Sequence, residues 1–184
     1  MKTLTEQDYI DAANELGCSV AAIKAVAEVE SLGSGFYKDG TPKILFERHK
    51  FSGFTNGKYD SQYPDISNTR AGGYTTGGEG ARFEKAAKLN RDAAIKSTSW
   101  GKFQIMGFNY NLVGFSTLQD FVNAMYESEG AQLKAFVKFV KSQKLDDELR
   151  DLRWADFARL YNGKNFRINK YDEKMAAAYK KYSK

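Results

Sequence analysis

The sequence predicts a mainly α-helical fold that contains one small β segment. Through most of the 184 residues, apolar side chains recur at intervals of three and four positions, which is the spacing of one helix face. Only residues 44–49 (Ile-Leu-Phe-Glu-Arg-His) form a good extended run, so any sheet is expected to be small. A chain of this length can bury a substantial single core, and nothing in the pattern requires a second domain.

Capping residues and a turn signal define the first elements. Thr5 can cap a helix over residues 6–16, and Ser19 can open a second helix that ends near Ser31. Residues 37–43 contain an Asp-Gly pair, a turn signal that precedes the extended run. The N-terminal part of the chain therefore predicts two helices, a turn and one strand.

Residues 52–80 form an irregular segment that is rich in Gly, Tyr, Asn, Ser and Thr and has almost no apolar periodicity. A stretch this long without regular structure is usually functional or disordered in a compact domain. Aromatic residues within it favour an ordered loop beside a binding groove over a flexible linker. These residues are Phe54, Tyr59, Tyr63 and Tyr74.

Helical periodicity returns after this segment. Predicted helices cover residues 81–96, a stretch that begins at the capping-box motif of Ser116 and includes Met125, and residues 131–143, 151–161 and 170–182. The last of these combines Tyr, Met and Ala residues with a basic end. Such a helix either packs on the core with a solvated lysine face or contacts an anionic membrane surface. We expect the packed arrangement.

Charge and composition limit the classes of function. The net charge of +5 and the pI of about 9.1 favour anionic partners such as nucleic acid, a membrane surface or an acidic polymer. No nucleic-acid-binding motif is present and the lysines are dispersed, so no nucleic-acid partner is expected. A single cysteine, Cys18, excludes a disulfide framework. With one histidine, His49, it argues against a His/Cys zinc site, and no metal or organic cofactor is expected.

Glu30 carries the strongest signal for chemistry. On the helix opened by Ser19, it shares a face with Ile23, Val26 and Ala27, which lie seven, four and three residues before it. An acid on an apolar face is desolvated in its charged form, which raises its pKa, and the negative end of the helix dipole acts in the same direction. A carboxyl group that stays protonated near neutral pH can serve as a general acid. The alternative is a glutamate that reaches solvent or pairs with a Lys or Arg.

Glu47, within the extended run, is the second candidate acid. A glycosidase generally uses two carboxyl groups, and a helix end, a turn and a short strand can bring Glu30 and Glu47 to one cleft. The alternative is a surface ion pair of Glu47 with Arg48 or Lys50, which would have little energetic weight. A Cys18–His49 nucleophile pair is disfavoured, because Cys18 lies at a helix-to-helix junction.

Four motifs occur in order along the chain. They are Val-Glu-Ser-Leu-Gly-Ser-Gly-Phe (29–36), Ile-Leu-Phe-Glu-Arg-His (44–49), Ser-Trp-Gly-Lys-Phe-Gln-Ile-Met-Gly (99–107) and Tyr-Asn-Gly (161–163). Together they closely resemble the N-acetylmuramidase domain of phage endolysins, a member of the lysozyme-like superfamily that includes goose-type lysozymes and lytic transglycosylases. The resemblance spans nearly the whole chain. It implies a mainly α, lysozyme-like α+β fold with a small β-hairpin or sheet beside a helical core. Family members often carry a separate wall-binding domain, but the resemblance begins near residue 5, so we expect one catalytic domain (1–184) without a separate wall-binding domain.

The resemblance also implies an activity and its residues. It implies hydrolysis of the β-1,4 bond between N-acetylmuramic acid and N-acetylglucosamine in peptidoglycan. Glu30 matches the family's catalytic acid, and Glu47 matches a second acidic position that we interpret as a general base or electrostatic partner. Other motif positions are expected to bind the substrate or to position Glu47. They are Ser99, Gln104, Tyr161, Asn162 and His49.

Two other functions stay open at this point. A lytic transglycosylase works with one Glu and leaves a 1,6-anhydro sugar, and a membrane-active cationic wall-binding protein would need no catalysis. The resemblance implies an endolysin that stays in the host cytoplasm until a holin releases it. We see no leader sequence and no apolar run long enough for a membrane span, which agrees with that expectation. Its expected partner is the peptidoglycan glycan strand, and the expected state is a monomer.

Overall fold

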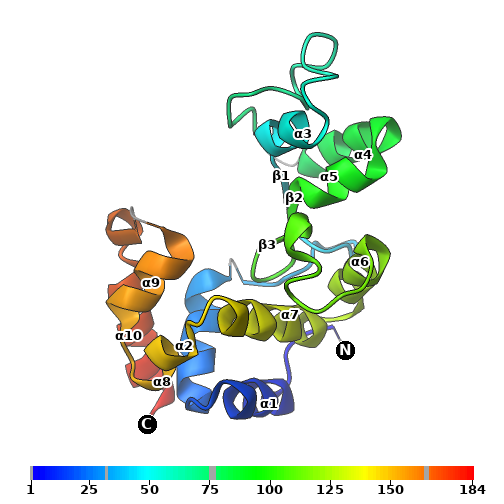
Figure 1. Cartoon of the computed structure of the whole chain (residues 1–184). Helices are drawn as coiled ribbons and strands as arrows, with labels where there is room; N and C mark the ends of the chain where they lie inside the picture. Colours follow the sequence, from blue (N-terminus) through cyan, green and yellow to red (C-terminus); the bar gives the residue numbers. More distant parts are fainter. Residues whose placement is uncertain (1, 32, 75–77, 164–165) are drawn as a thin grey trace.

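The structure is a computed structural model that describes residues 2–31, 33–74, 78–163 and 166–184. Two groups of helices lie on either side of a small sheet (Figure 1). The larger group comprises α1 (Glu6–Leu16), α2 (Val20–Glu30), α6 (Leu118–Glu127), α7 (Glu129–Ser142), α8 (Asp146–Arg150), α9 (Trp154–Asn162) and α10 (Tyr171–Tyr182). The smaller group comprises α3 (Arg48–Phe54), α4 (Glu79–Leu89) and α5 (Arg91–Lys96). This arrangement confirms the predicted mainly α, lysozyme-like fold class.

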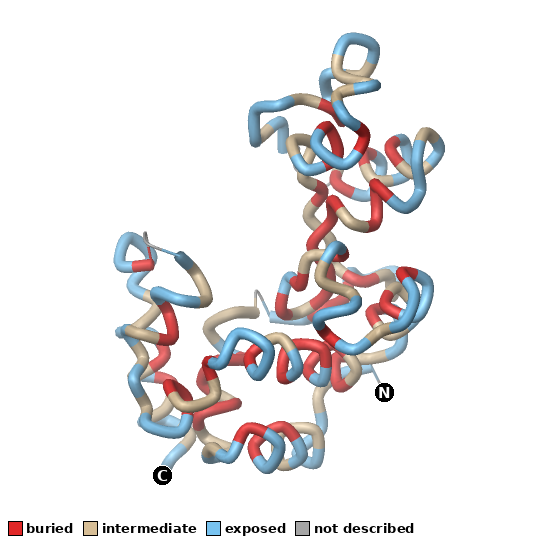
Figure 2. Tube along the Cα trace, in the orientation of Figure 1, coloured by how far each residue is buried: buried red, intermediate tan, exposed pale blue. Residues whose placement is uncertain are grey.

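Each group of helices has its own hydrophobic core, and Figure 2 shows buried residues in both. Ile23 and Phe136, both fully buried, belong to the larger core, whereas Phe46 and Phe51 belong to the smaller one. Phe83 of α4 packs against both cores. The two groups are therefore connected through packed side chains as well as through the sheet.

The first two helices begin and end where the capping residues predict. The Thr5 side chain accepts the backbone N–H of Asp8, whose carboxylate accepts the N–H of Thr5 in return, so the two residues form a capping box. Gly17 ends α1 at a φ of 65°, in the left-handed region that glycine adopts without strain. Ser19 accepts the N–H of Ala22 at 3.2 Å and opens α2.

The sheet has three short antiparallel strands in the order β1 (Ile44–Phe46), β2 (Thr98–Trp100) and β3 (Ile105–Met106). Leu45 pairs with Ser99, and Ser99 pairs with Met106. A single-turn 3-10 helix, Gly107–Asn109, follows β3. The small sheet is confirmed, although two of its three strands lie in a segment for which no strand was expected.

The extended run ends earlier than predicted. Only residues 44–46 form a strand, because α3 begins at Arg48 and the N–H of Phe51 donates to the Glu47 carbonyl oxygen at 3.1 Å. The change to helix brings the Phe51 ring to 5.8 Å from the Phe46 ring in the smaller core. The prediction of extended structure over 47–49 was therefore wrong, because packing of Phe51 outweighs the local preference.

The helix predicted over residues 81–96 is two helices. Asn90 interrupts it at a φ of −157°, and its side chain accepts the N–H of Ala93 at 3.0 Å to cap α5. An asparagine at this point serves as a helix start rather than as an interior residue. Apolar periodicity continues across the break, which is why the sequence pattern did not reveal it.

Other helix bounds differ from the prediction by a few residues. α6 is capped by Thr117, which accepts the N–H of Asp120 at 3.0 Å, rather than by Ser116. α7 begins before residue 131, since Ser128 is its N-cap. The short helix α8 was not predicted, and α9 starts only after it.

The irregular segment 52–80 begins with the last turn of α3 and is held by its own contacts. Tyr59 packs against the smaller core, and Ile66 is fully buried within it. Two serine hydroxyls donate to the Asp60 carboxylate at 2.9 and 2.5 Å. Residues 75–77 of the predicted loop lie outside the described residues.

The C-terminal helix packs as expected. α10 lies along α2 and α9, with Met175 and Ala178 buried. Phe166–Asn169 forms a 3-10 turn before it. Among the described residues, no helix combines the length and the apolar character that crossing a bilayer requires.

Gly107 is expected to be intolerant of a side chain. A Cβ at this position would lie 2.0 Å from the carbonyl oxygen of Ile95, at the end of α5, so the backbone would have to move. We expect Gly107→Ala to reduce the free energy of unfolding in urea by about 3 kcal/mol. Gly80→Ala in α4 is the matched control, because nothing lies within 4 Å of its Cβ, and it should be neutral or stabilising by up to about 1 kcal/mol. Equal effects of the two changes would contradict the expectation.

Candidate active site

Glu30 is the last residue of α2, and its carboxyl group lies in an apolar environment. Ile23, Val26 and Ala27, which share its face, are at most 2% exposed. Oε1 of Glu30 is buried and has no hydrogen-bond partner among the described residues. Burial raises the pKa of Glu30 from 4.5 to about 7, against a smaller lowering by the hydrogen bond from Asn162. The end of α2 therefore carries a carboxyl group that is about half protonated at neutral pH.

Glu28, two residues earlier, shows what the same residue type does on the solvent side. Its side chain accepts hydrogen bonds from Lys181 at 2.7 Å and from the Tyr182 hydroxyl. These bonds lower the pKa of Glu28. The two glutamates therefore differ in pKa because they lie on different faces of α2.

α9 supplies the group that touches Glu30. Nδ2 of Asn162 donates to Oε2 of Glu30 at 2.9 Å, while Oδ1 of Asn162 is buried without a partner. Tyr161 donates its hydroxyl to the carbonyl oxygen of Phe103 at 3.2 Å and stacks on Phe157. Burial, with a smaller contribution from the charge of Glu30, raises the pKa of Tyr161 well above its ordinary value. Asn162 is thus directed at the acid, and Tyr161 supports α9 from the core.

Ser99 and Gln104 form a second group on the sheet. The Ser99 hydroxyl donates to Oε1 of Gln104 at 2.7 Å, and Nε2 of Gln104 donates to the carbonyl oxygen of Gly101 at 2.9 Å. Gln104 is exposed and has a φ of 49°, an unusual left-handed conformation for a residue with a side chain. Two hydrogen bonds therefore fix an exposed amide at the turn between β2 and β3.

Glu47 and His49 form a third group at the start of α3. The Tyr74 hydroxyl lies 3.0 and 2.9 Å from the two carboxylate oxygens of Glu47, and Nδ1 of His49 lies 3.3 Å from Oε2. Burial raises the pKa of Tyr74, and the hydrogen bond to Glu47 and the negative charge of Glu47 raise it further. Tyr74 was noted in the sequence only as a loop aromatic. Its contact with an acid 27 residues away had no local signal.

The predicted site residues therefore gather in three groups rather than one. The first joins Glu30 and Asn162 in the larger group of helices, and the others lie on the sheet and at the start of α3 (Figure 1). Between described residues, no hydrogen bond or ion pair connects Glu30 to Glu47. Among the same residues, no cluster of three or more His, Cys, Asp or Glu side chains could hold a metal ion.

Comparison with known proteins places this arrangement in a family. The family model described as Muramidase, N-acetylmuramidase, matches residues 19–183. The chain belongs to the N-acetylmuramidase family. It is a glycoside hydrolase of the lysozyme type that acts on peptidoglycan. Among curated proteins, the comparison finds no match.

A solved structure supports the assignment of the chain to the muramidases. The crystal structure of the Burkholderia AP3 phage endolysin superposes with a TM-score of 0.93 and is 43% identical in sequence. The match covers 99% of this chain and 71% of that one. The similarity thus includes both groups of helices and the sheet between them.

In this muramidase, a buried acid that sequence reasoning missed holds the turn after Glu30. Glu129, at the start of α7, is 3% exposed and accepts the N–H of Gly35 at 2.6 Å. Lys102 lies 3.4 Å from the same carboxylate and donates to the carbonyl oxygen of Gly33 at 2.5 Å. Glu129 shares a face with the buried Phe136, so the pattern that marks Glu30 also marks this residue.

A second buried acid holds the strand that precedes Glu47. Glu79 of α4 accepts the N–H of Phe46 at 3.0 Å and pairs with Arg82 at 3.0 Å. Arg82 in turn donates to the carbonyl oxygen of Asp65 at 3.0 Å. These contacts fix the last residue of β1 directly before Glu47.

Asn162 is expected to tune the proton affinity of Glu30 in this muramidase. Its hydrogen bond stabilises the charged carboxylate, so Asn162→Ala should raise the pKa of Glu30 from about 7 by roughly one further unit. NMR titration of the Glu30 side-chain carboxyl carbon measures this shift. Asn111→Ala, at an exposed position, is the control and should leave the pKa unchanged. A lower pKa in Asn162→Ala would contradict the assigned role.

Proposed function

We propose that this chain is an endolysin that hydrolyses the β-1,4 bond between N-acetylmuramic acid and N-acetylglucosamine, with Glu30 as the general acid. One observation carries the proposal: burial raises the pKa of Glu30 to about 7, and one of its oxygens has no partner. The protonated group donates to the glycosidic oxygen as positive charge develops on the sugar ring. Asn162 holds the carboxyl group during this transfer through the other oxygen.

Glu47 is the proposed second acid. Its carboxylate stabilises the oxocarbenium-like transition state or activates water, while the Tyr74 hydroxyl orients it and His49 lies beside it. The exposed Gln104 amide borders the bound strand and is suited to hydrogen bonding with the substrate. Ser99, which is 4% exposed, holds Gln104 from behind, and Tyr161 holds α9 and with it Asn162. The two acids, which come from different groups of helices, then face one glycan strand.

The proposed role is lysis of a bacterial host at the end of a phage cycle. The likeness to a Burkholderia phage endolysin supports this role. In this role the enzyme acts as a monomer and reaches the wall from the host cytoplasm after a holin opens the inner membrane. The exposed lysines near the end of α10 contact the anionic envelope surface.

Product analysis on purified sacculi tests the reaction. Mass spectrometry should find reducing muramic acid ends after digestion with the parent enzyme. Glu30→Ala should release no soluble muropeptides under the same conditions. Products that end in 1,6-anhydro muramic acid would contradict hydrolysis.

A lytic transglycosylase is the second candidate, and one observation favours it. Both oxygens of Glu47 are engaged by Tyr74, whereas Glu30 keeps an oxygen without a partner, as expected if one acid works alone. Glu47→Gln separates the two reactions. A hydrolase that depends on Glu47 should lose about 10²-fold in rate or more, and a transglycosylase should retain most of its activity.

A further inference from the structure

Two phenylalanine rings lie together on the surface without a role in either core. Phe54 at the end of α3 is 43% exposed, and Phe108, just after β3, is 38% exposed. Their ring centroids are 6.1 Å apart at an angle of 48°. Nζ of Lys50 lies 5.8 Å from the Phe108 centroid. We call Lys50, Phe54 and Phe108 the aromatic platform.

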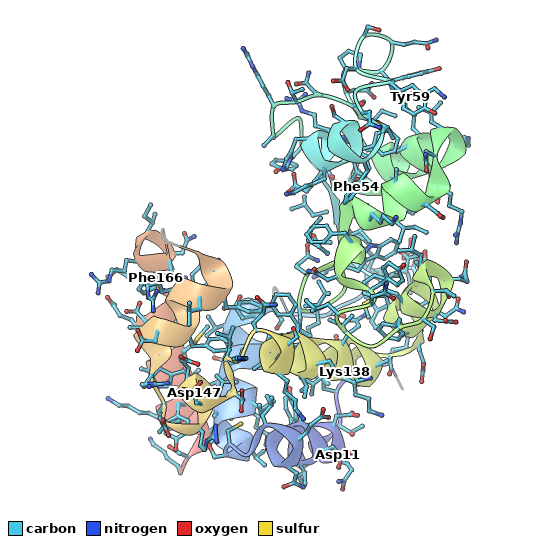
Figure 3. The ribbon with its side chains drawn as sticks, viewed as in Figure 1. Asp11, Phe54, Tyr59, Lys138, Asp147 and Phe166 are labelled. Atoms are coloured by element: carbon cyan, nitrogen blue, oxygen red, sulfur yellow. The ribbon has the colours of Figure 1, made fainter. Side chains whose placement is uncertain are left out.

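The platform is continuous with the proposed active site. Glu47, Lys50 and Phe54 are separated by three and four residues, so they follow one stripe along α3. At the rise of an α-helix, the backbone of Phe54 lies about 10 Å from that of Glu47. Figure 3 labels Phe54 at the lower edge of the smaller group of helices, whereas Tyr59 lies at the far edge.

Phe108 links the platform to the sheet. It belongs to the 3-10 turn that directly follows β3, and β3 pairs with β2, the strand of Ser99. The aromatic pair is therefore connected along the chain to the Glu47 group through α3, and to the Ser99 group through β3. A polymer bound along Glu47 and Gln104 would meet the platform as it continues.

The chemistry of the platform matches a glycan strand that carries anionic peptide stems. Aromatic faces offer flat apolar area to the C–H face of a sugar ring, at low conformational cost. Lys50 is exposed beside them, and its ammonium group can pair with a stem carboxylate. A surface for anionic lipid would need several cations together, but on this stripe of α3 the platform offers one lysine.

We propose that Lys50, Phe54 and Phe108 form a distal subsite for the peptidoglycan strand. Phe54 and Phe108 stack on one N-acetylhexosamine ring, and Lys50 binds a carboxylate of the peptide stem. The inference rests on the proposed function, because it takes the strand to run past Glu47. It adds specificity for long, stem-bearing strands to that function.

The first test measures binding apart from catalysis. In a Glu30→Gln background, co-sedimentation with sacculi should weaken about 3- to 10-fold for a Phe54→Ala/Phe108→Ala double variant. Tyr126→Ala on α6 is the control, because Tyr126 is as exposed as Phe54, at 43%. This control variant should bind sacculi as well as the background variant does. Melting temperatures equal to that of the background variant show that folding is intact. Unchanged sedimentation of the folded double variant would overturn the proposal, even if Glu30 proves to be the general acid.

The second test separates the sugar and stem contacts. With Glu30 intact, the double variant should raise KM on sacculi about 3- to 10-fold at unchanged kcat. Lys50→Gln should raise KM about 2- to 5-fold on stem-bearing strands and not at all on strands that an amidase has stripped of stems. Lys85→Gln, on the exposed face of α4, is the matched control. The glycan assignment would be overturned in favour of a membrane surface if the double variant and Lys50→Gln bound vesicles of anionic phospholipid more weakly than the parent, while their KM stayed unchanged on stem-bearing and on stripped strands.

Discussion

Replacing Glu30 by Gln is expected to reduce the rate of peptidoglycan hydrolysis by about 10²–10⁴-fold. Glutamine keeps the size of the side chain and an oxygen that can accept the Asn162 bond, but it has no acidic proton to donate. The rate should be measured as release of reducing ends from sacculi, at substrate concentrations on both sides of KM. A loss that appears in kcat rather than in KM would assign Glu30 to the transition state.

The pH dependence of the parent enzyme follows from the same residue. In the proposed mechanism only the protonated form of Glu30 donates a proton, so activity should fall as pH rises through about 7. The free energy of unfolding should also fall as pH rises. The folded pKa is above the ordinary 4.5, so the unfolded chain releases the proton first and stability decreases between pH about 4.5 and about 7. The decrease should amount to about 3 kcal/mol and should be absent in Glu30→Gln.

Urea unfolding at pH 4.5 and pH 8 measures this difference, and Glu28→Gln serves as its control. Glu28 lies on the same helix in an exposed position, and the hydrogen bonds from Lys181 and Tyr182 lower its pKa. Loss of this group should leave the catalytic rate near that of the parent. It should also leave the decrease of stability toward neutral pH in place. Parallel pH dependences for Glu30→Gln and the parent would contradict the assigned protonation of Glu30.

The environment of Glu30 could be predicted because it depends on one helix. Ser19 sets the start of α2, and helical geometry then puts Glu30 on the face of Val26 and Ala27. The same local logic predicted the Thr5 cap and α10. Each of these depends on residues within about two helical turns of one another.

The sheet was harder to predict, because its partners are distant in sequence. Thr98–Trp100 forms a strand through pairing with Ile44–Phe46, more than fifty positions earlier. The segment Thr-Ser-Trp is followed directly by Gly101 and shows no clear alternation of apolar and polar residues, so no strand was expected there. Tertiary packing also explains why the extended run ends before Glu47, because the helix that starts at Arg48 buries Phe51.

The candidate site shows this contrast most clearly. Motif positions identified Glu30 and Glu47, but not the groups that hold Glu47 and the turn after Glu30. Tyr74 reaches Glu47 across 27 residues, and Glu129 reaches Gly35 across 94 residues. Such contacts depend on how helices and loops assemble, and single-sequence patterns carry little information about that.

Glu129→Ala is expected to have the largest effect on stability. Its carboxylate accepts the N–H groups of Gly35 and Leu4, at 2.6 and 3.2 Å, and lies 3.4 Å from Nζ of Lys102. Truncation would leave two N–H groups and a largely buried ammonium without this carboxylate. Removing one partner of a buried ion pair typically costs about 3–5 kcal/mol, and we expect urea unfolding to show a loss of this size. Glu127→Ala, two positions earlier and exposed, should change stability by no more than about 0.5 kcal/mol.

A double variant separates the role of Glu129 in stability from its role in the active site. Glu129→Leu/Lys102→Met removes both charges and replaces them with apolar groups, so much of the lost stability should return. The N–H of Gly35 would still lack its acceptor, and the turn that follows Glu30 would no longer be held from α7. We therefore expect kcat on sacculi to stay below that of the parent in a protein that is stably folded. Full recovery of both stability and kcat would mean that the contact with Gly35 does not position Glu30.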